Sequence, residues 1–445
     1  MSNKNMEFGS SQSSFLSRVF LSLKESTLTF SLIKLVILVF TYGLSIQSCY
    51  ISFQLLNLKF FLILNGVEIM KKWLILFCSL LCTACMPPEK ILERQGISTI
   101  IGYDLLDDGT YLGTISLLQF DRKEEKTSET ISAVGTTSKQ IRQILEQKTS
   151  HDITSGQLRT LLFNKDMTET KGISNFLDTM QRDTSIGSLI FLAITDNAED
   201  IIKNGNYEEY PEMGSYIYQL LDKQERKEML INSNLHDFFS TLYEIGIDPT
   251  LPIISNKEGV APYINSVALF KNDKMVGSIS LKKTMFIKLF THRKAFLGDI
   301  TLNIPVETFK QKGVSLAEKP KEDKFNITIH PIKHRGSIEL STEDEVKLNA
   351  TISVSTIEGQ PAVTLKNKES IKKLEQLLGE ELNKEFGDFL EELRKLNSDP
   401  IGIGRKIKSL RKYSKLNDKD LREKYSTLKL KSTIKVEIKR TGAID

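Results

Sequence analysis

Apolar and polar residues alternate at characteristic spacings in the chain beyond residue 96, and the spacings predict its elements. Residues 97–103 and 111–120 are mostly apolar, and Asp107, Asp108 and Gly109 separate the two runs. An Asp-Gly pair between two such runs predicts a β-hairpin, because glycine readily adopts the positive φ of a tight turn. We therefore expect a hairpin at the start of the folded part.

Helices and buried strands are predicted in alternation as far as residue 204. Apolar residues recur every three or four positions at 138–148 and 172–182, which is typical of amphipathic helices. Short apolar runs at 161–163 and 189–194 have the length of buried strands. This alternation predicts one mixed domain over residues 85–204.

A middle domain is predicted over residues 205–312, beginning with a polar linker. A helical stretch extends from residue 215 to about residue 245, and Pro249 then ends it. Apolar runs at 267–270 and 275–281 flank a short polar segment, which predicts a second hairpin.

The last domain is predicted over residues 313–445. Apolar and polar residues alternate at 325–329, 336–340 and 346–354. This period of two predicts antiparallel strands with one solvent-facing side. An apolar stripe over 371–396 predicts a long helix of roughly 40 Å, and residues 428–438 return to the alternation of a strand.

The first 69 residues have two explanations. Residues 15–64 are apolar and almost free of acidic groups. Residues 28–46 are long enough for a marginal membrane span, although Lys34 lies inside it. The other explanation, which we favour, is a mis-assigned upstream extension over residues 1–69.

A complete secretory signal begins at Met70. Lys71 and Lys72 precede an apolar core that is too short to span a bilayer, and small residues follow it. Signal peptides of this kind work at the extreme N-terminus. We therefore predict that Met70 is the true start and that residues 70–84 are a signal peptide.

The residues before Cys85 resemble a bacterial lipobox, in which small residues lead into a cysteine that receives a diacylglycerol thioether. Thr83 and Ala84 fit the pattern, whereas Cys82 stands where leucine is usual. We expect cleavage between Ala84 and Cys85 and lipidation of Cys85, which would tether the chain to a membrane. The alternative is an ordinary secretory signal with an incidental cysteine.

Composition limits the chemistry of the remaining chain. Of 445 residues, 40% are hydrophobic and 26% charged, which is ordinary for a folded protein. All four cysteines lie at or before Cys85, so the body has no disulfide, thiolate metal site or cysteine nucleophile. The net charge of +4 belongs to the first 84 residues, and the predicted mature chain is neutral.

Residues 104–109 superficially resemble the start of a calcium loop. Leu106 and Ile115 occupy positions where such a loop needs oxygen ligands, so a hairpin turn is the better interpretation. Gly402 and Gly404 resemble part of a dinucleotide-binding loop, but Ile407 stands where the third glycine is required. Because a helix precedes them, we interpret these glycines as a helix-terminating turn.

Histidines and neighbouring polar residues do not form a convincing catalytic or metal site. His330 and His334 would lie roughly 13 Å apart on an extended strand, too far to share one zinc ion. His151, Asp152 and Ser155 lie too close in sequence for a hydrolytic triad, whose members come from distant segments. We predict no catalytic, cofactor-binding or metal-binding residues.

One basic cluster has two interpretations. It comprises Arg405, Lys406, Lys408, Arg411, Lys412 and Lys415. These residues could contact anionic lipid headgroups or an acidic partner, or they could form a solvated helix face, which we favour. Nucleic acid is disfavoured, because no aromatic residues are interleaved with the charges.

Several local motifs, taken in order, resemble one known family. They are Gly102-Tyr103-Asp104, residues 172–178 with 181–183, residues 268–277, residues 398–404 and residues 436–442. Together with the lipobox, they resemble the Ger(x)C family, the lipoprotein C subunits of germinant receptors in endospore-forming bacteria. The resemblance extends from about Met70 to the C-terminus.

The resemblance implies an α+β fold of three mixed helix and strand domains after a lipoprotein signal peptide. The last domain would be an antiparallel sheet with a long amphipathic helix. It also implies a non-enzymatic, lipid-anchored receptor subunit that assembles with A and B integral membrane subunits. Such a subunit would act in nutrient-triggered germination, on the extracytoplasmic face of the inner spore membrane.

A solute-binding lipoprotein that captures a small ligand for a transporter is the alternative. Whether a nutrient binds directly to this chain is left open by the sequence.

Overall fold

A computed structural model describes most of the chain beyond residue 93. The described residues are 94–119, 128–203, 212–227, 229–257, 260–292, 296–314, 323–359 and 368–439. They belong to one compact unit, Lys90–Asp445. Ala84, Cys85, the predicted signal peptide and the predicted extension over residues 1–69 lie outside the described residues.

The predicted first hairpin is confirmed. Strands β1 (Gln95–Leu105) and β2 (Tyr111–Leu118) pair antiparallel, and β3 (Ser128–Gly135) pairs with the outer side of β2. Gly109 has a φ of +82° in the turn, where its N–H donates to the carbonyl of Leu106. The Asp-Gly signal in the sequence therefore marks the turn correctly.

The large sheet continues from β1 through parallel strands and ends in a second hairpin. Its order is β3-β2-β1-β5-β6-β7-β8-β9, and the short β4 (Asp152–Thr154) also pairs with β1. The further strands are β5 (Thr160–Asn164), β6 (Phe191–Thr195), β7 (Thr250–Lys257), β8 (Val260–Lys271) and β9 (Lys274–Ser280). All residues of β5 and β6 are buried, as expected for parallel strands covered on both faces.

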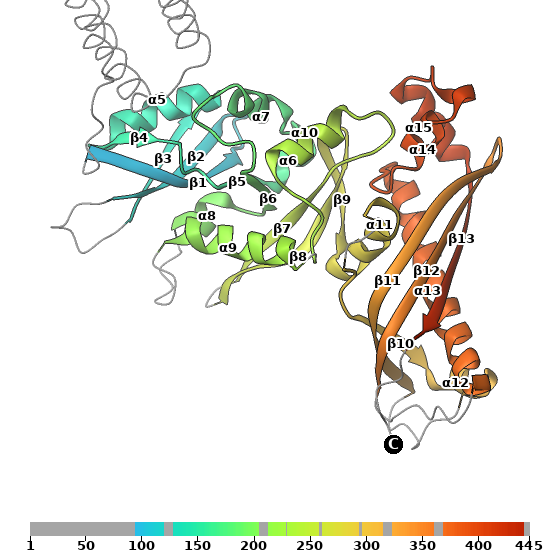
Figure 1. Ribbon diagram of the computed structural model, residues 1–445. Helices are drawn as coiled ribbons and strands as arrows, with labels where there is room; N and C mark the ends of the chain where they lie inside the picture. Colours follow the sequence, from blue (N-terminus) through green and yellow to red (C-terminus); the bar gives the residue numbers. More distant parts are fainter. Residues whose placement is uncertain are drawn as a thin grey trace, which may run out of the picture. The chain divides into compact units, whose positions relative to one another are not determined.

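Helices cover both faces of this sheet (Figure 1). The buried apolar residues of α5 (Ser138–Lys148), α7 (Ser174–Gln181) and α10 (Leu235–Tyr243) belong to one core cluster. Those of α8 (Ala198–Lys203) and α9 (Met213–Arg226) belong to another. The short α6 (Lys165–Thr170) follows β5 directly.

The prediction of one helical stretch from residue 215 to about residue 245 was wrong. The structure has two helices, α9 and α10, because Asn234 starts a new helix. Its side-chain Oδ1 accepts a hydrogen bond of 2.9 Å from the N–H of Asp237. Asparagine is among the best N-cap residues, since its side chain satisfies an N–H that has no partner within the helix.

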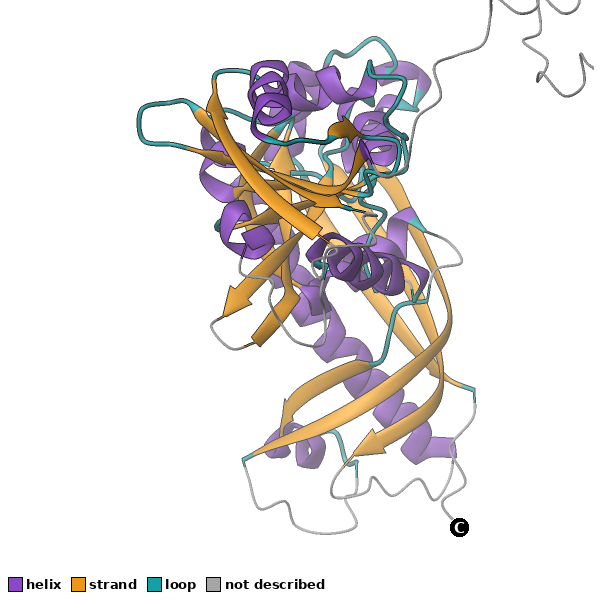
Figure 2. Cartoon of the chain, turned by 90° about the vertical axis from the view of Figure 1, so that its left-hand side faces the viewer, coloured by secondary structure: helices purple, strands orange, loops and turns teal. Residues whose placement is uncertain are grey.

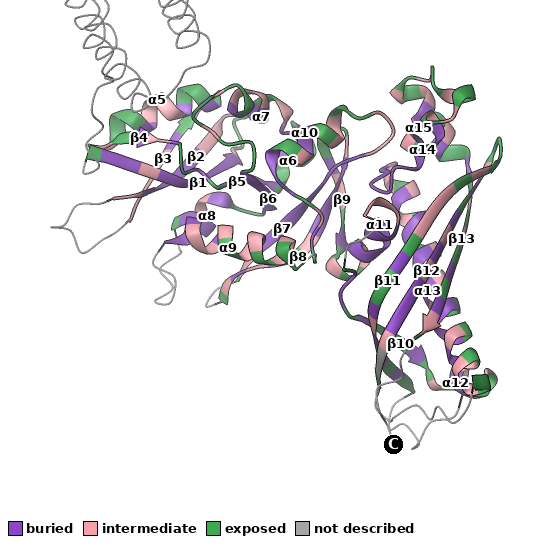
Figure 3. Cartoon of the chain, viewed as in Figure 1, coloured by how far each residue is buried: buried purple, intermediate pink, exposed green. Residues whose placement is uncertain are grey.

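The second sheet has four strands in the order β10-β11-β12-β13. They are β10 (Ile300–Pro305), β11 (Lys324–Thr342), β12 (Glu345–Gly359) and β13 (Lys429–Ile438). Buried and exposed residues alternate along the first half of β11 (Figure 3). The predicted strands at 325–329 and 336–340 are thus two parts of one strand, with register shifts between His330 and Lys333.

This sheet differs from the prediction in one pairing. The β10–β11 and β11–β12 pairs are antiparallel, as predicted, whereas β12 and β13 are parallel. Two parallel neighbours need a long crossover connection. Here the crossover contains α13 (Lys368–Leu396), a helix of 29 residues that confirms the predicted long helix.

Helix α13 lies along the second sheet, next to β13 (Figure 2). The side chain of Asn383 fixes the two together, since its Nδ2 donates to the carbonyl of Ile434 at 3.0 Å and its Oδ1 accepts from the N–H of Ile434 at 2.8 Å. The alternation of apolar residues predicted the strand and the helix, but not this pairing.

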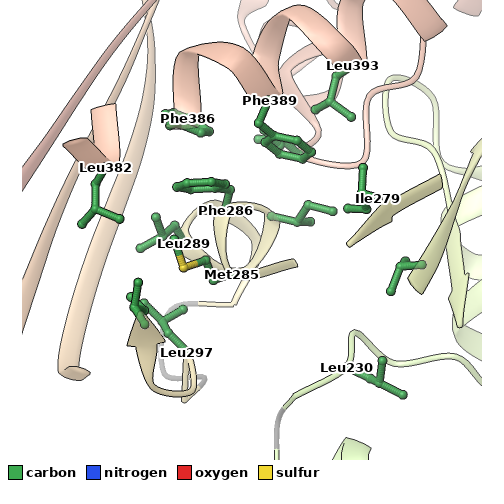
Figure 4. Close-up of a cluster of buried hydrophobic side chains, with 14 of the residues drawn as sticks. Leu230, Ile279, Met285, Phe286, Leu289, Leu297, Leu382, Phe386, Phe389 and Leu393 are labelled. Carbon is green, nitrogen blue, oxygen red and sulfur yellow. The ribbon is translucent and has the colours of Figure 1, made fainter. Parts of the chain in front are cut away.

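Helix α11 (Thr284–Thr291) packs against the middle of α13 (Figure 4). The ring centroid of Phe286 lies 5.1 Å from that of Phe386 and 5.7 Å from that of Phe389. Through these contacts one core cluster extends from the α8–α9 side of the large sheet to the second sheet.

Short helical elements complete the structure. They are η2 (Leu281–Lys283), α12 (Val306–Gln311), α14 (Ile403–Lys408), η3 (Arg411–Tyr413) and α15 (Asp418–Thr427). The fold is α+β, as predicted. The predicted boundary after residue 204 falls between β6 and β7, which are paired, and the division into domains at residues 204 and 312 stays a prediction. No helix among the described residues is long and apolar enough to cross a membrane.

Candidate functional site

The turn between β8 and β9, residues 271–274, contacts the loop before α7. The Oγ of Ser174 donates to Oδ2 of Asp273 at 2.5 Å, and the N–H of Ile173 donates to the carbonyl of Asp273 at 3.3 Å. Gly172 has a φ of +77°, and a Cβ there would lie 2.5 Å from the Asp273 carboxylate. Two segments that carry the family resemblance therefore meet at this turn.

A third such segment reaches the same hairpin from the C-terminal end of α13. The buried Ser398 Oγ donates to the carbonyl of Phe270 at 2.6 Å. Leu396 packs against Gly277 so closely that a Cβ on the glycine would lie 2.7 Å from its side chain. The hairpin is therefore held from one side by the α7 loop and from the other by the segment after α13.

Asp248 lies beside this hairpin and accepts hydrogen bonds from three segments. Both Nη atoms of Arg422 donate to its carboxylate, at 2.8 Å and 3.1 Å. The N–H groups of Asn272 and Asp399 donate to it at 3.2 Å and 2.8 Å. The Asp248 side chain is 1% exposed, so its charge is compensated by the bidentate arginine and not by water.

Asp399 is a second buried carboxylate, and backbone groups satisfy it. Its Oδ1 accepts from the N–H groups of Gly402 and Ile403 at 2.9 Å and 3.0 Å, and its Oδ2 accepts from Gly404 at 2.7 Å. Burial, with a smaller contribution from the nearby charge of Asp248, raises the pKa of Asp399 to about 7, although these N–H groups lower it.

Two glycines allow the loop before Asp248 and the loop after Asp399 to touch through their backbones. Gly246 has a φ of +84°, and its carbonyl accepts from the N–H of Arg405 at 2.6 Å. A Cβ on Gly246 would lie 2.4 Å from the backbone of Gly404 and Arg405. The glycines at 402 and 404 therefore serve a packing contact as well as a turn.

We call Asp248, Asn272, Ser398, Asp399 and Arg422 the 248–399 junction. Each oxygen of its two carboxyl groups accepts at least one hydrogen bond from the protein. Through Asp248 it joins Arg422 of α15 and Asp399 after α13 to the β8–β9 turn at Asn272. Within the described residues, no group of three or more His, Cys, Asp or Glu side chains is arranged to hold a metal ion.

The residues considered from the sequence take ordinary structural positions. Asp104 lies in β1 and accepts hydrogen bonds from Ala198 and Glu199 at 2.8 Å and 2.9 Å, at the first residues of α8. Burial raises the pKa of this carboxyl group. It therefore acts as a helix cap and not as a calcium ligand, and the hairpin turn itself lies beyond it.

The interpretation of residues 402–404 as a helix-terminating turn was wrong in detail. Helix α13 ends at Leu396, and Gly402, with a φ of +79°, is the N-cap of the next helix, α14. The glycine therefore begins a helix where the sequence predicted the end of one.

The histidines have separate partners. His330 is paired with Asp299 at 2.6 Å on the surface, and the buried His334 contacts the carbonyl of His292 at 2.8 Å. His151 lies 4.0 Å from Glu129. These contacts do not bring His151, His330 and His334 together at one site.

The basic cluster is partly engaged within the chain. Arg405 pairs with Glu244 at 3.1 Å, Lys412 pairs with Glu343, and Lys408 Nζ donates to the carbonyl of Leu416 at 2.7 Å. Arg405, Lys408 and Lys412 thus have partners within the chain, which favours the interpretation as an ordinary helix face over a lipid or partner contact. The lipid or partner contact stays open for Lys406, Arg411 and Lys415.

Sequence reasoning missed Asp248, Asn272 and Arg422. One signal was present, since both buried carboxylates stand directly before a proline, in Asp248-Pro249 and in Asp399-Pro400. A proline keeps the preceding residue out of the helical region, so an acid there is held in a loop next to backbone N–H groups. Nothing in the sequence pointed to Arg422 as their partner.

Comparisons with known proteins cover nearly all of the described residues. A family model described as spore germination protein N-terminal domain matches residues 88–256, and one described as spore germination B3/GerAC like, C-terminal, matches residues 265–442. The spore germination protein GerQC of Bacillus cereus is 28% identical over 380 residues, which cover 84% of this chain and 100% of that protein.

Two further similarities were found. The YfkR protein of Bacillus subtilis (strain 168) is 23% identical over 329 residues, covering 72% of this chain and 80% of its own length. The crystal structure of the GerBC protein superimposes with a TM-score of 0.49 at 14% identity, covering 76% of this chain and 97% of that one.

Proposed function

Because the chain belongs to the Ger(x)C family of spore germination proteins, we propose that it is the lipid-anchored, non-enzymatic C subunit of a germinant receptor. The observation that carries the proposal is the pair of family models, which follow each other in order from residue 88 to residue 442. In this role the chain assembles with A and B integral membrane subunits and is needed for nutrient-triggered germination.

The proposed mechanism is conformational coupling and not bond chemistry. The 248–399 junction supports this view, because it connects the β8–β9 hairpin to the segments that follow α13. A movement imposed on one side of the junction by a membrane subunit would be passed to the other side through hydrogen bonds between buried groups.

The proposed anchor is the lipidated Cys85, which places the folded part on the extracytoplasmic face of the inner spore membrane. The N-terminal family model begins at residue 88, so the anchor would directly precede the family domain. An acyl chain contributes about 0.8 kcal/mol per buried methylene, and stable anchoring needs more than one such chain.

Substitution of Cys85 tests the anchor and the function together. Spores that carry Cys85→Ala should lose the protein from the inner membrane fraction and germinate poorly with nutrients, while germination by a non-nutrient trigger is retained. Cys78→Ala is the matched control, because it removes a cysteine of the predicted signal peptide that lies outside the lipobox. Full membrane retention and full nutrient germination of Cys85→Ala spores would contradict the proposal.

The assembly with membrane subunits needs its own test. An affinity tag at the C-terminus should recover two multi-span membrane proteins from spore membranes that contain the wild-type chain. Recovery of a transporter complex instead would favour the alternative, a solute-binding lipoprotein. Mass analysis of the mature N-terminus would also test the predicted start at Met70 and the cleavage before Cys85.

A further inference from the structure

A cavity of about 200 Å³ lies between the large sheet and the helices α5 and α7. Its inner wall consists of apolar side chains from the sheet, among them Ile101, Ile115 and Ile153, and of Ile141 and Leu145 from α5. An apolar cavity of about 150 Å³ accepts a benzene molecule in a protein core. The space is therefore large enough for a small ring or a short branched chain that carries one polar group.

Three buried hydroxyl groups line the same cavity. Tyr103, Ser138 and Ser155 are 2%, 7% and 3% exposed, and all three contribute to the lining of the cavity. A hydroxyl group can both donate and accept a hydrogen bond, so these groups can recognise a polar atom of a ligand in the cavity. Burial raises the pKa of Tyr103 well above its ordinary value, so its hydroxyl stays protonated and can donate.

The mouth of the cavity carries positive charge. Lys139, Arg142 and Arg182 line it together with one carboxylate, Asp183, and Arg182 is itself paired with Asp178 at 2.9 Å. Arg142 pairs with Asp183 at 3.1 Å and remains 40% exposed, so part of its guanidinium can still receive another anion. Helix α5 begins at Ser138, which adds the positive end of a helix dipole on the same side.

From these features we infer that the cavity binds a small monocarboxylate with an apolar tail. The tail lies against the isoleucines of the sheet, the carboxylate lies at the mouth near Arg142 and Lys139, and the hydroxyls of Tyr103 and Ser138 donate hydrogen bonds to it. A cationic ligand would be repelled by Lys139 and Arg142, and a neutral ligand would leave the Arg142 side of the mouth unused.

This inference does not rest on the proposed function. A receptor subunit and a solute-binding lipoprotein could each use such a site, and the test measures binding to the purified chain. A negative result would remove the ligand site and leave the receptor proposal as it stands.

Benzoate is a suitable probe, with benzamide as its neutral isostere and benzylamine as a cation of similar size. Ligand-observed saturation-transfer NMR on the full-length protein in lipid nanodiscs detects weak binding to a large assembly. We expect saturable benzoate binding that is at least tenfold tighter than that of benzamide, and no competition by benzylamine. Equal affinity for benzoate and benzamide would overturn the inference.

Two substitutions place the binding in this cavity. Arg142→Met should weaken benzoate binding at least tenfold, whereas Arg226→Met, which breaks a similar exposed pair with Asp222 on α9, should leave it unchanged. Ser155→Leu should fill the cavity and abolish binding, with circular dichroism to confirm the fold. Unchanged benzoate affinity in Arg142→Met would overturn the inference even if Ser155→Leu failed to fold.

Discussion

The backbone N–H of Asp399 donates a hydrogen bond of 2.8 Å to the carboxylate of Asp248, 151 residues earlier in the chain. Both side chains are buried. Asp248 lies in the loop after helix α10, and Asp399 lies in the loop after helix α13. The bond connects the loop before β7 directly to the loop before α14. Asp248 also accepts hydrogen bonds from Arg422 and Asn272. A substitution at one residue of the junction should therefore alter the hydrogen bonds of the others.

Removal of the Arg422 side chain should destabilise the protein strongly. Arg422→Met would leave the Asp248 carboxylate buried without its bidentate partner, and breaking such a pair typically costs about 3–5 kcal/mol. We expect a loss of this order in the free energy of unfolding, measured by urea titration followed by circular dichroism.

Arg226→Met is the control for that measurement. Arg226 forms an exposed pair with Asp222 within α9, and such pairs contribute about 0.3–0.5 kcal/mol. Similar losses for the two variants would mean that the junction contributes no more than a surface ion pair.

Titration of Asp399 should make stability depend on pH. Its pKa is about 7 in the folded state, against about 3.9 in an unfolded chain, so the folded state holds the proton more tightly. Its contribution to stability is therefore greatest below about pH 4 and is lost as pH rises to about 7, by about 1.4 kcal/mol per pH unit.

Asp399→Asn isolates this effect, because asparagine does not titrate. The amide should cost stability at low pH, since its NH₂ faces the N–H of Gly404 in place of an acceptor. The stability advantage of the wild type over the variant should then shrink between pH 4 and pH 7. Urea titrations of both proteins at several pH values measure this difference, and a constant difference would show that Asp399 does not titrate in this range.

The sequence predicted most single elements, since each depends on local spacing. The Asp108-Gly109 turn, the helix α5 and the long α13 were all found where the pattern of apolar residues placed them. The break at Asn234 was missed, because its capping role is visible only once the next helix is known to begin there. The parallel β12–β13 pair was missed because strand direction depends on the path of the crossover, not on alternation.

The candidate sites were predictable to a smaller degree. The segments that contain Asp273 and Asp399 were singled out by their family resemblance, but their meeting at one hairpin depends on the tertiary fold. Arg422 stands 174 positions from Asp248, and no local pattern distinguishes it from the other basic residues of α15. A buried pair of this kind can be identified only when the tertiary fold that brings both partners together is known.

The aromatic contact between α11 and α13 should contribute several kcal/mol. Phe386 is fully buried and lies against Phe286 and Phe290, at centroid distances of 5.1 Å and 5.4 Å. Phe386→Ala should reduce the free energy of unfolding by about 3–5 kcal/mol through lost burial and a cavity. Tyr243→Ala, at a side chain that is 69% exposed, is the control, and an equal loss there would contradict the packing role of Phe386.

Substitution of Gly246 separates close packing from backbone strain at the 248–399 junction. Gly246 and Gly109 have nearly equal φ values, +84° and +82°, so alanine is strained to the same extent at both. A Cβ at residue 246 would also lie 2.4 Å from the backbone of Gly404 and Arg405, whereas a Cβ at residue 109 meets nothing within 4 Å.

We therefore expect Gly109→Ala to cost about 1 kcal/mol and Gly246→Ala to cost clearly more, because the second loop must move away. Displacement of that loop would lengthen the Asp399–Asp248 bond, so the pH dependence assigned to Asp399 should weaken in Gly246→Ala as well. Urea titrations at pH 5 and pH 8 measure both effects. Equal losses for the two alanine variants would show that the loops tolerate separation and that the junction does not couple them.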